Sequence, residues 1–153
     1  MALLTYFGFA QRFVPMPRWS RVLGDVGSIP NDWMGKKVER LPMRSASLAE
    51  TRVARAVARA SRALPWTPTC LAEAAAGQCL LRMARCSGVV VIGLRRTDLT
   101  VNEQWDAHAW LLGRRGALTG GPAAAGFTAT TVYEVDEGLR ATEVDLVTPP
   151  RSS

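Results

Sequence analysis

The spacing of apolar residues changes at Ser87 and Gly88, and this change limits the folds open to the chain. Before it, apolar residues recur every three to four positions, which is typical of amphipathic helices. After it, residues 89–92 (VVVI) begin a series of β-branched runs, which is typical of strands. Helices followed by strands that are joined through short turns predict an α+β fold, with helices packed on an antiparallel sheet.

Two helices are predicted in the middle of the chain. Ser47 and Glu50 have the spacing of a capping box, so we expect a helix over 47–64 that stops before a proline. A second helix is expected over 70–85, with Gly88 as the glycine that follows its C-terminal cap.

Less regular structure is expected nearer the N-terminus. A first amphipathic helix is indicated by four apolar residues at helical spacing, namely Leu3, Phe7, Ala10 and Val14. A short second helix is expected within residues 14–24. Residues 28–44 predict a loop, either a connector or a mobile flap, because Pro, Gly, Asn and Asp interrupt any period.

Four strands are predicted after the helices, over residues 88–96, 105–112, 116–121 and 126–135. Residues 97–104 are expected to form a loop, residues 113–116 (GRRG) a hairpin turn, and the final residues a frayed tail. Because side chains alternate along a strand, Asp106, His108 and Trp110 should share one face of the second strand.

Composition narrows the class of protein. The chain has 153 residues, which suits one domain with a buried core, and a net charge of +6 carried almost wholly by arginine. Such a charge suits nucleic acid, an acidic peptide or a membrane surface, or reflects a coding bias towards arginine. The predicted helix over 47–64 carries a stripe of arginines, which either docks an acidic partner or is simply solvated: Arg52, Arg55, Arg59 and Arg62.

The location of the protein is also constrained. Three cysteines are an odd number, which argues against a disulfide framework and favours a reducing compartment. The N-terminus lacks the basic region and cleavage site of a signal peptide, and no apolar run is long enough to span a membrane. We therefore expect a cytoplasmic protein that does not enter a membrane.

Cys70 stands out among the three cysteines because it lies at the start of a predicted helix. The free N–H groups and partial positive charge of a helix N-terminus favour the thiolate, which is the reactive form of cysteine. Cys79 and Cys86 lie within and at the end of the same helix, where a small buried apolar side chain is the expected role. The three spacings match no zinc-ligand pattern, so no metal or cofactor is expected.

His108 is the chain's only histidine. A lone histidine on a strand is commonly structural, but one beside a helix-start cysteine can form a thiolate–imidazole pair. The sequence alone leaves both readings open.

Several segments together resemble a known family: "VARAVARASRALPWTPTCL", "GQCLLRMARCSGVVVIGLRR", "HAW" and "FTATTVYE". The chain resembles the B proteins of lasso-peptide biosynthesis, which are transglutaminase-like cysteine proteases. The resemblance implies a papain-like or transglutaminase-like fold with Cys70 as nucleophile and His108 as general base. It also implies a bacterial enzyme that cuts the leader from a peptide precursor, so that a separate asparagine-synthetase-like cyclase can close the ring.

The resemblance also shapes the expected domain layout. Residues 1–46 would hold N-terminal helices and a loop, 47–148 the catalytic core and 149–153 the tail, within one compact domain. Some family members begin with a fused leader-recognition domain, and too few residues precede Ser47 to hold one. The chain thus resembles the stand-alone form, which would need a separate leader-recognition protein to deliver the precursor.

One family feature is missing. Many members carry an aspartate about twelve residues after the histidine, and this chain has Gly120 there. Counting back across the predicted hairpin instead places Gly121 opposite His108, so neither count yields a carboxylate. Asp106 on the same strand face is the first candidate to orient His108, and other candidates are Glu134, Asp136, a backbone group or a water.

Two alternatives to a peptidase remain at this point. The missing aspartate would also fit a non-catalytic transglutaminase-like scaffold that only holds the leader or the cyclase. The arginine stripe would fit a nucleic-acid-binding module, although the chain lacks the interleaved aromatic and basic strand residues of a typical RNA-binding sheet.

Overall fold

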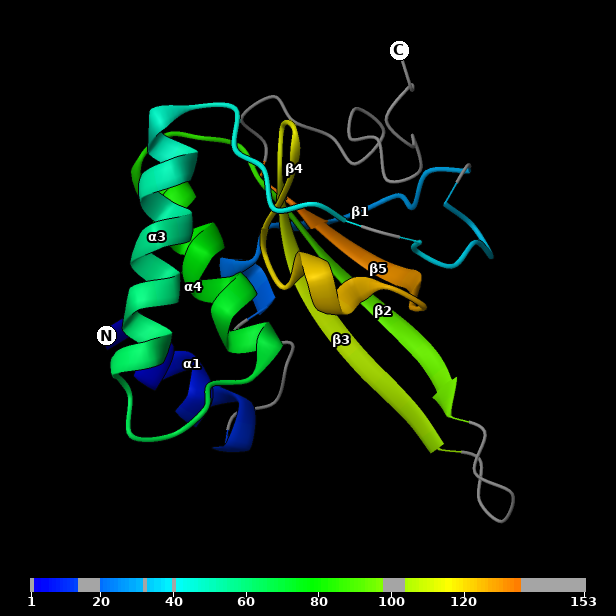
Figure 1. The fold of residues 1–153 in the computed structure, drawn as a ribbon, viewed down its shortest axis with the longest axis horizontal. Helices are drawn as coiled ribbons and strands as arrows, with labels where there is room; N and C mark the ends of the chain where they lie inside the picture. Colours follow the sequence, from blue (N-terminus) through cyan, green and yellow to red (C-terminus); the bar gives the residue numbers. More distant parts are fainter. Residues whose placement is uncertain (1, 14–19, 32, 40, 98–103, 136–153) are drawn as a thin grey trace.

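The fold has one antiparallel sheet with helices on one side (Figure 1). A computed structural model describes residues 2–13, 20–31, 33–39, 41–97 and 104–135. Five strands pair in the order β1-β5-β2-β3-β4: β1 Asp25–Gly27, β2 Val89–Thr97, β3 Gln104–Gly113, β4 Gly116–Thr119 and β5 Thr128–Glu134. Every neighbouring pair is antiparallel.

Among the described residues, three α-helices lie on one face of this sheet: α1 Ala2–Phe13, α3 Leu48–Ala63 and α4 Cys70–Met83. The predicted α+β fold class is confirmed. Four fully buried alanines of α4 meet Val90 and Leu111 of the sheet in the first hydrophobic core. A Cβ on Gly77 would lie 2.6 Å from Leu111, so small side chains are what let α4 approach the sheet this closely.

The opposite face of the sheet is covered by the segment over residues 28–44, which the sequence predicted to be a loop, either a connector or a mobile flap. Trp33, Val38 and Leu41 from this loop are buried in a second core, together with Trp110 and Phe127. Backbone bonds hold the loop in place, because Val38 N–H donates to Phe127 and Gly126 N–H donates back to Val38. The described part of the loop is therefore a packed second layer.

The start of α3 confirms the predicted capping box. Ser47 Oγ accepts from the backbone N–H of Glu50, and the Glu50 carboxylate accepts from the N–H groups of Ala46 and Ser47. The other oxygen of Glu50 accepts from the N–H of Arg114, at 3.0 Å, in the turn between β3 and β4. One buried carboxylate thus ties the start of α3 to the sheet.

The end of α4 differs from the prediction. The helix ends at Met83, and Arg85, not Gly88, takes the left-handed position, with φ of 52°. The N–H groups of Arg85 and Cys86 bond back to Arg82 and Leu81, which completes a Schellman motif. Gly88 instead makes room for packing, since a Cβ there would lie 2.5 Å from Leu81.

The β3–β4 hairpin pairs Gly113 with Gly116 as predicted, but its register then shifts. A bulge between Leu111 and Leu112 places Thr119 opposite Leu111, so the prediction that Gly121 lies opposite His108 is wrong. β4 ends at Thr119 and the chain turns into a 3-10 helix, η2 (Gly121–Ala124), so the predicted strand over 116–121 is too long by two residues.

Near the N-terminus the structure adds two short elements. A 3-10 helix, η1 (Ser20–Val22), lies within the segment where a short helix was expected, and β1, which the sequence analysis missed, follows it. Val14, most of the predicted 97–104 loop and the tail lie outside the described residues. Among the helices that are described, none is long and apolar enough to cross a membrane.

Candidate active site

Cys70 is the first residue of α4, as the sequence predicted. Thr69 precedes it in an extended conformation, and its Oγ1 accepts from the N–H of Ala72 at 3.2 Å as the N-cap. The N–H of Cys70 has no helical acceptor because it lies in the first turn. The Cys70 thiol therefore lies at the positive end of the α4 dipole, beside free backbone donors.

The thiol also reaches the edge of β3. The N–H of Ala109 points out of the sheet edge and donates to Cys70 Sγ, at 3.4 Å. This edge is open at Ala109 because β4 ends at Thr119, which pairs with Leu111. The start of α4 takes the place that a longer β4 would have filled.

His108 comes to the same edge from the other face of the sheet. Its neighbour Ala109 belongs to the first core, whereas the His108 ring contacts Phe127 and Trp110 of the second core. Only at an open edge can side chains from both faces meet. There the Cys70 thiol and the His108 imidazole form a hydrogen bond.

The pair favours a thiolate–imidazolium state. Burial by itself would raise the pKa of Cys70, but bonds from His108 and the Ala109 N–H, with the charge on His108, hold that pKa below its ordinary value. The bond to Cys70 raises the pKa of His108 against the opposing effect of burial, and the carbonyl of Gly120 raises it further. Each partner stabilises the charged form of the other.

The second ring nitrogen of His108 is held by a backbone carbonyl. Nε2 lies 2.9 Å from the oxygen of Gly120. A carbonyl can only accept, so Nε2 carries a hydrogen, and Nδ1 is the nitrogen left to face the thiol. Gly120 has φ of 70°, and a Cβ there would lie 2.6 Å from the Ala109 oxygen and 3.2 Å from Nε2. Glycine is required at this position.

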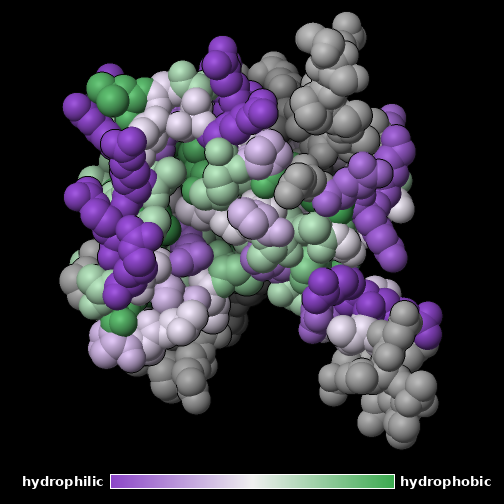
Figure 2. Space-filling view, viewed as in Figure 1, coloured by the Kyte–Doolittle hydropathy of each residue, from purple (hydrophilic) through white to green (hydrophobic). Residues whose placement is uncertain are grey.

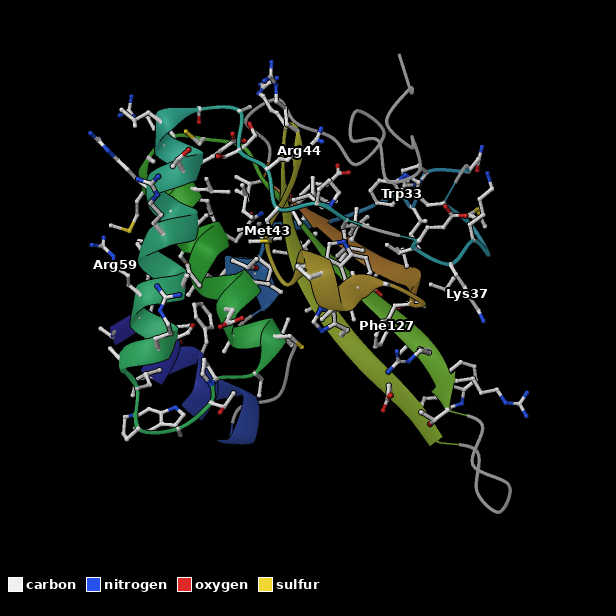
Figure 3. The ribbon with its side chains drawn as sticks, in the orientation of Figure 1. Trp33, Lys37, Met43, Arg44, Arg59 and Phe127 are labelled. Atoms are coloured by element: carbon white, nitrogen blue, oxygen red, sulfur yellow. The ribbon has the colours of Figure 1, made fainter. Side chains whose placement is uncertain are left out.

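Aromatic side chains fix the plane of the imidazole. The Trp110 ring stacks on it with centroids 6.0 Å apart, and Phe127 (labelled in Figure 3) lies 5.4 Å away at a tilt. Gly93 makes room for Trp110, since a Cβ there would lie 2.7 Å from the indole. Sequence reasoning missed Phe127, because the residue lies just before β5 and nothing local marks it as a neighbour of His108.

The acids proposed to orient His108 lie elsewhere. Asp106 forms an ion pair with Arg95 across the β2–β3 ladder at 3.0 Å, with both side chains nearly half exposed. Glu134 lies beside Gly27 on the far strand pair, about 13 Å along the sheet from the level of His108. Asp136 lies outside the described residues. The partner of Nε2 is therefore the Gly120 carbonyl and not the Asp106 carboxylate.

The other two cysteines are placed differently. Cys79 and Cys86 are partly buried and pack against the first core. Burial raises the pKa of Cys79, against a smaller opposing effect of Arg82. Of the described residues, no three His, Cys, Asp or Glu side chains are grouped so that they could hold a metal ion.

Comparison with known families agrees with this geometry. The family model of the transglutaminase-like superfamily matches residues 10–132, so the chain belongs to that superfamily. No curated protein and no solved structure gives a significant match. The matched region begins before the predicted boundary at residue 46 and contains both Cys70 and His108.

Proposed function

We propose that this protein is a cysteine peptidase that removes the leader from a lasso-peptide precursor. The observation that carries the chemistry is the hydrogen-bonded pair of Cys70 and His108 at the open edge of β3. The superfamily includes cysteine peptidases and acyltransferases, and both classes begin with attack by a thiolate on a carbonyl. The choice of a lasso-peptide leader as substrate rests on the sequence resemblance.

The first half of the reaction forms an acyl-enzyme. The Cys70 thiolate attacks the carbonyl carbon at the end of the leader, and the oxygen gains the negative charge. The free N–H of Cys70 at the start of α4 is placed to stabilise that charge. The His108 imidazolium then gives a proton to the leaving amine, which is the new N-terminus of the core peptide.

The second half releases the leader. Neutral His108 takes a proton from water, and the resulting hydroxide attacks the thioester carbonyl. The C–S bond breaks, the leader leaves with a free carboxylate, and the proton on His108 returns the pair to its starting state. Throughout, the Gly120 carbonyl keeps the hydrogen on Nε2, so that Nδ1 exchanges the proton.

The open edge of β3 is the proposed place for the leader backbone. Backbone groups alternate along an antiparallel strand, so the outward N–H of Ala109 implies that Ala107 also presents its N–H and C=O outward. Ala107 is exposed, and β4 does not extend to it. Figure 2 shows a recess between the helices and the projecting β2–β3 arm, and β3 is the strand of that arm on the recess side (Figure 1).

An extended peptide that paired with this edge would run directly to the thiol. Main-chain pairing of this kind binds a peptide without reading its sequence, so a separate leader-recognition protein would supply specificity. The core peptide would then pass to an asparagine-synthetase-like cyclase. We place these steps in the bacterial cytoplasm.

The proposal is tested by incubating the protein with its precursor and the leader-recognition protein and identifying products by mass. Wild type should yield a leader with a free carboxylate and an intact core peptide. Cys70→Ala should abolish both products, while the matched variant Cys79→Ala should retain them. Cleavage by the Cys70→Ala variant, or no cleavage by wild type, would reject the proposal. If wild type does not cleave the precursor and its Cys70 thiol reacts like an ordinary cysteine, a non-catalytic scaffold would be favoured.

A further inference from the structure

Four arginines of α3 form one exposed basic face. Arg52, Arg55, Arg59 and Arg62 follow one another at spacings of three or four residues, so they lie along one side of the helix. Figure 2 shows hydrophilic side chains gathered over α3, and Figure 3 shows Arg59 pointing away from the sheet. Within the described part of the chain, none of the four is in an ion pair with a carboxylate.

These side chains border a groove with an apolar floor. The groove has a volume of about 620 Å³, and Ala54 and Ala58, one helical turn apart, line it beside the arginines. Small residues at this spacing let another helix approach closely. α3 is about 24 Å long, which matches a partner helix of about 16 residues.

A second, smaller hollow continues the groove towards the sheet. It has a volume of about 190 Å³, shares Ala54 and Arg55 with the first, and adds Met43 and Arg44. Met43 is an exposed apolar side chain at the end of a basic surface (Figure 3). This surface, which we call the α3 groove, therefore combines five positive charges with an apolar contact at one end.

We infer that the α3 groove docks an acidic amphipathic helix of a protein partner. Glutamates or aspartates on such a helix would meet the unpaired arginines, its backbone would pass over Ala54 and Ala58, and an apolar residue at one end would cover Met43. Nucleic acid would also meet the arginines, but the alanine floor and Met43 offer nothing to phosphates or bases. The inference does not depend on Cys70, so a Cys70→Ala variant should bind the same partner.

The test uses the full chain and a labelled helical peptide of about 18 residues, with glutamates along one face and two leucines at one end. Fluorescence anisotropy measures its binding to wild type and to two matched variants. Arg55→Gln with Arg59→Gln removes two charges from the α3 groove, and Arg114→Gln with Arg115→Gln removes two from the β3–β4 turn. Thermal unfolding shows that both variants are folded.

Docking predicts that the α3 variant loses at least about tenfold in affinity, whereas the turn variant binds like wild type. Met43→Ser should also weaken binding of the peptide but not binding of a 20-base-pair DNA duplex, a length of about two helical turns. The inference is overturned if the peptide does not bind, or if both double variants weaken peptide binding equally. It is also overturned if the DNA duplex binds more tightly than the peptide and its binding depends on the same arginines.

Discussion

The Nε2 of His108 lies 2.9 Å from the carbonyl oxygen of Gly120, the position where the sequence resemblance predicts an aspartate. A carbonyl fixes the ring tautomer as a carboxylate does, but it carries only a partial charge. The stabilisation of the imidazolium therefore falls more heavily on the Cys70 thiolate, whose bond to His108 is the largest contribution to its raised pKa. Cys70 and His108 therefore depend on each other more than they would in a triad.

Gly120→Asp, which places an acid where the sequence resemblance predicts one, should lower activity. The position has φ of 70°, and the new Cβ would lie 2.6 Å from the Ala109 oxygen, so the turn must move and take its carbonyl away from Nε2. We expect a loss of about tenfold or more in cleavage rate. Peptide-cleavage kinetics measure it.

Gly120→Ala is the control, because it brings the same Cβ without the acid. Both variants should lose activity to a similar degree. If the aspartate variant matched or exceeded wild type while the alanine variant failed, the carbonyl would be a poor substitute for an acid that this fold can accept.

The Cys70 thiol should remain reactive at a lower pH than an ordinary cysteine. Its pKa is lowered from the ordinary value of a thiol, so the thiolate persists as pH falls below that value. Alkylation by iodoacetamide, followed at each cysteine by mass mapping, should show a midpoint for Cys70 below that value. Cys79, whose pKa is raised by burial, should show one above it.

His108→Ala should move the Cys70 midpoint upward, because it removes both the hydrogen bond and the positive charge that stabilise the thiolate. The Cys79 profile should not change. An unperturbed Cys70 profile in wild type would contradict the thiolate–imidazolium pair and support a scaffold role.

The sequence was enough to predict the local structure around Cys70 and around His108, but not how the two residues come together. The helix start at Cys70 could be predicted because Thr69 and its neighbours encode the cap locally. The strand face of His108 followed from alternation along β3. The bulge between Leu111 and Leu112 and the end of β4 at Thr119 could not be predicted, because both depend on how β4 meets η2, and the end of β4 leaves the β3 edge open to α4. The sequence analysis placed a carboxylate first among the groups that could orient His108, whereas the backbone oxygen of Gly120 has this role.

Glu50→Ala should destabilise the fold beyond the loss of a helix cap. The carboxylate is buried and accepts from backbone N–H groups in two places, at the start of α3 and at Arg114. We expect a loss of about 2–4 kcal/mol in the free energy of unfolding, measured with urea, because buried donors are left without acceptors. Ser47→Ala, which removes only the cap, should cost about 1 kcal/mol. Equal losses would mean that the Arg114 bond contributes nothing.

Ala107→Pro should impair peptide cleavage while it spares the fold and the thiol. The outward N–H of Ala107 is not bonded within the sheet, so proline removes a donor from the open edge without breaking the ladder with β2. If the substrate pairs with this edge, kcat/KM should fall by about tenfold, equivalent to about 1.4 kcal/mol. Ala107→Ser keeps the N–H and should retain activity. The pH profile of Cys70 alkylation should be the same in both variants, which separates lost binding from a damaged pair. A proline variant with full activity and an intact fold would place the substrate elsewhere in the recess.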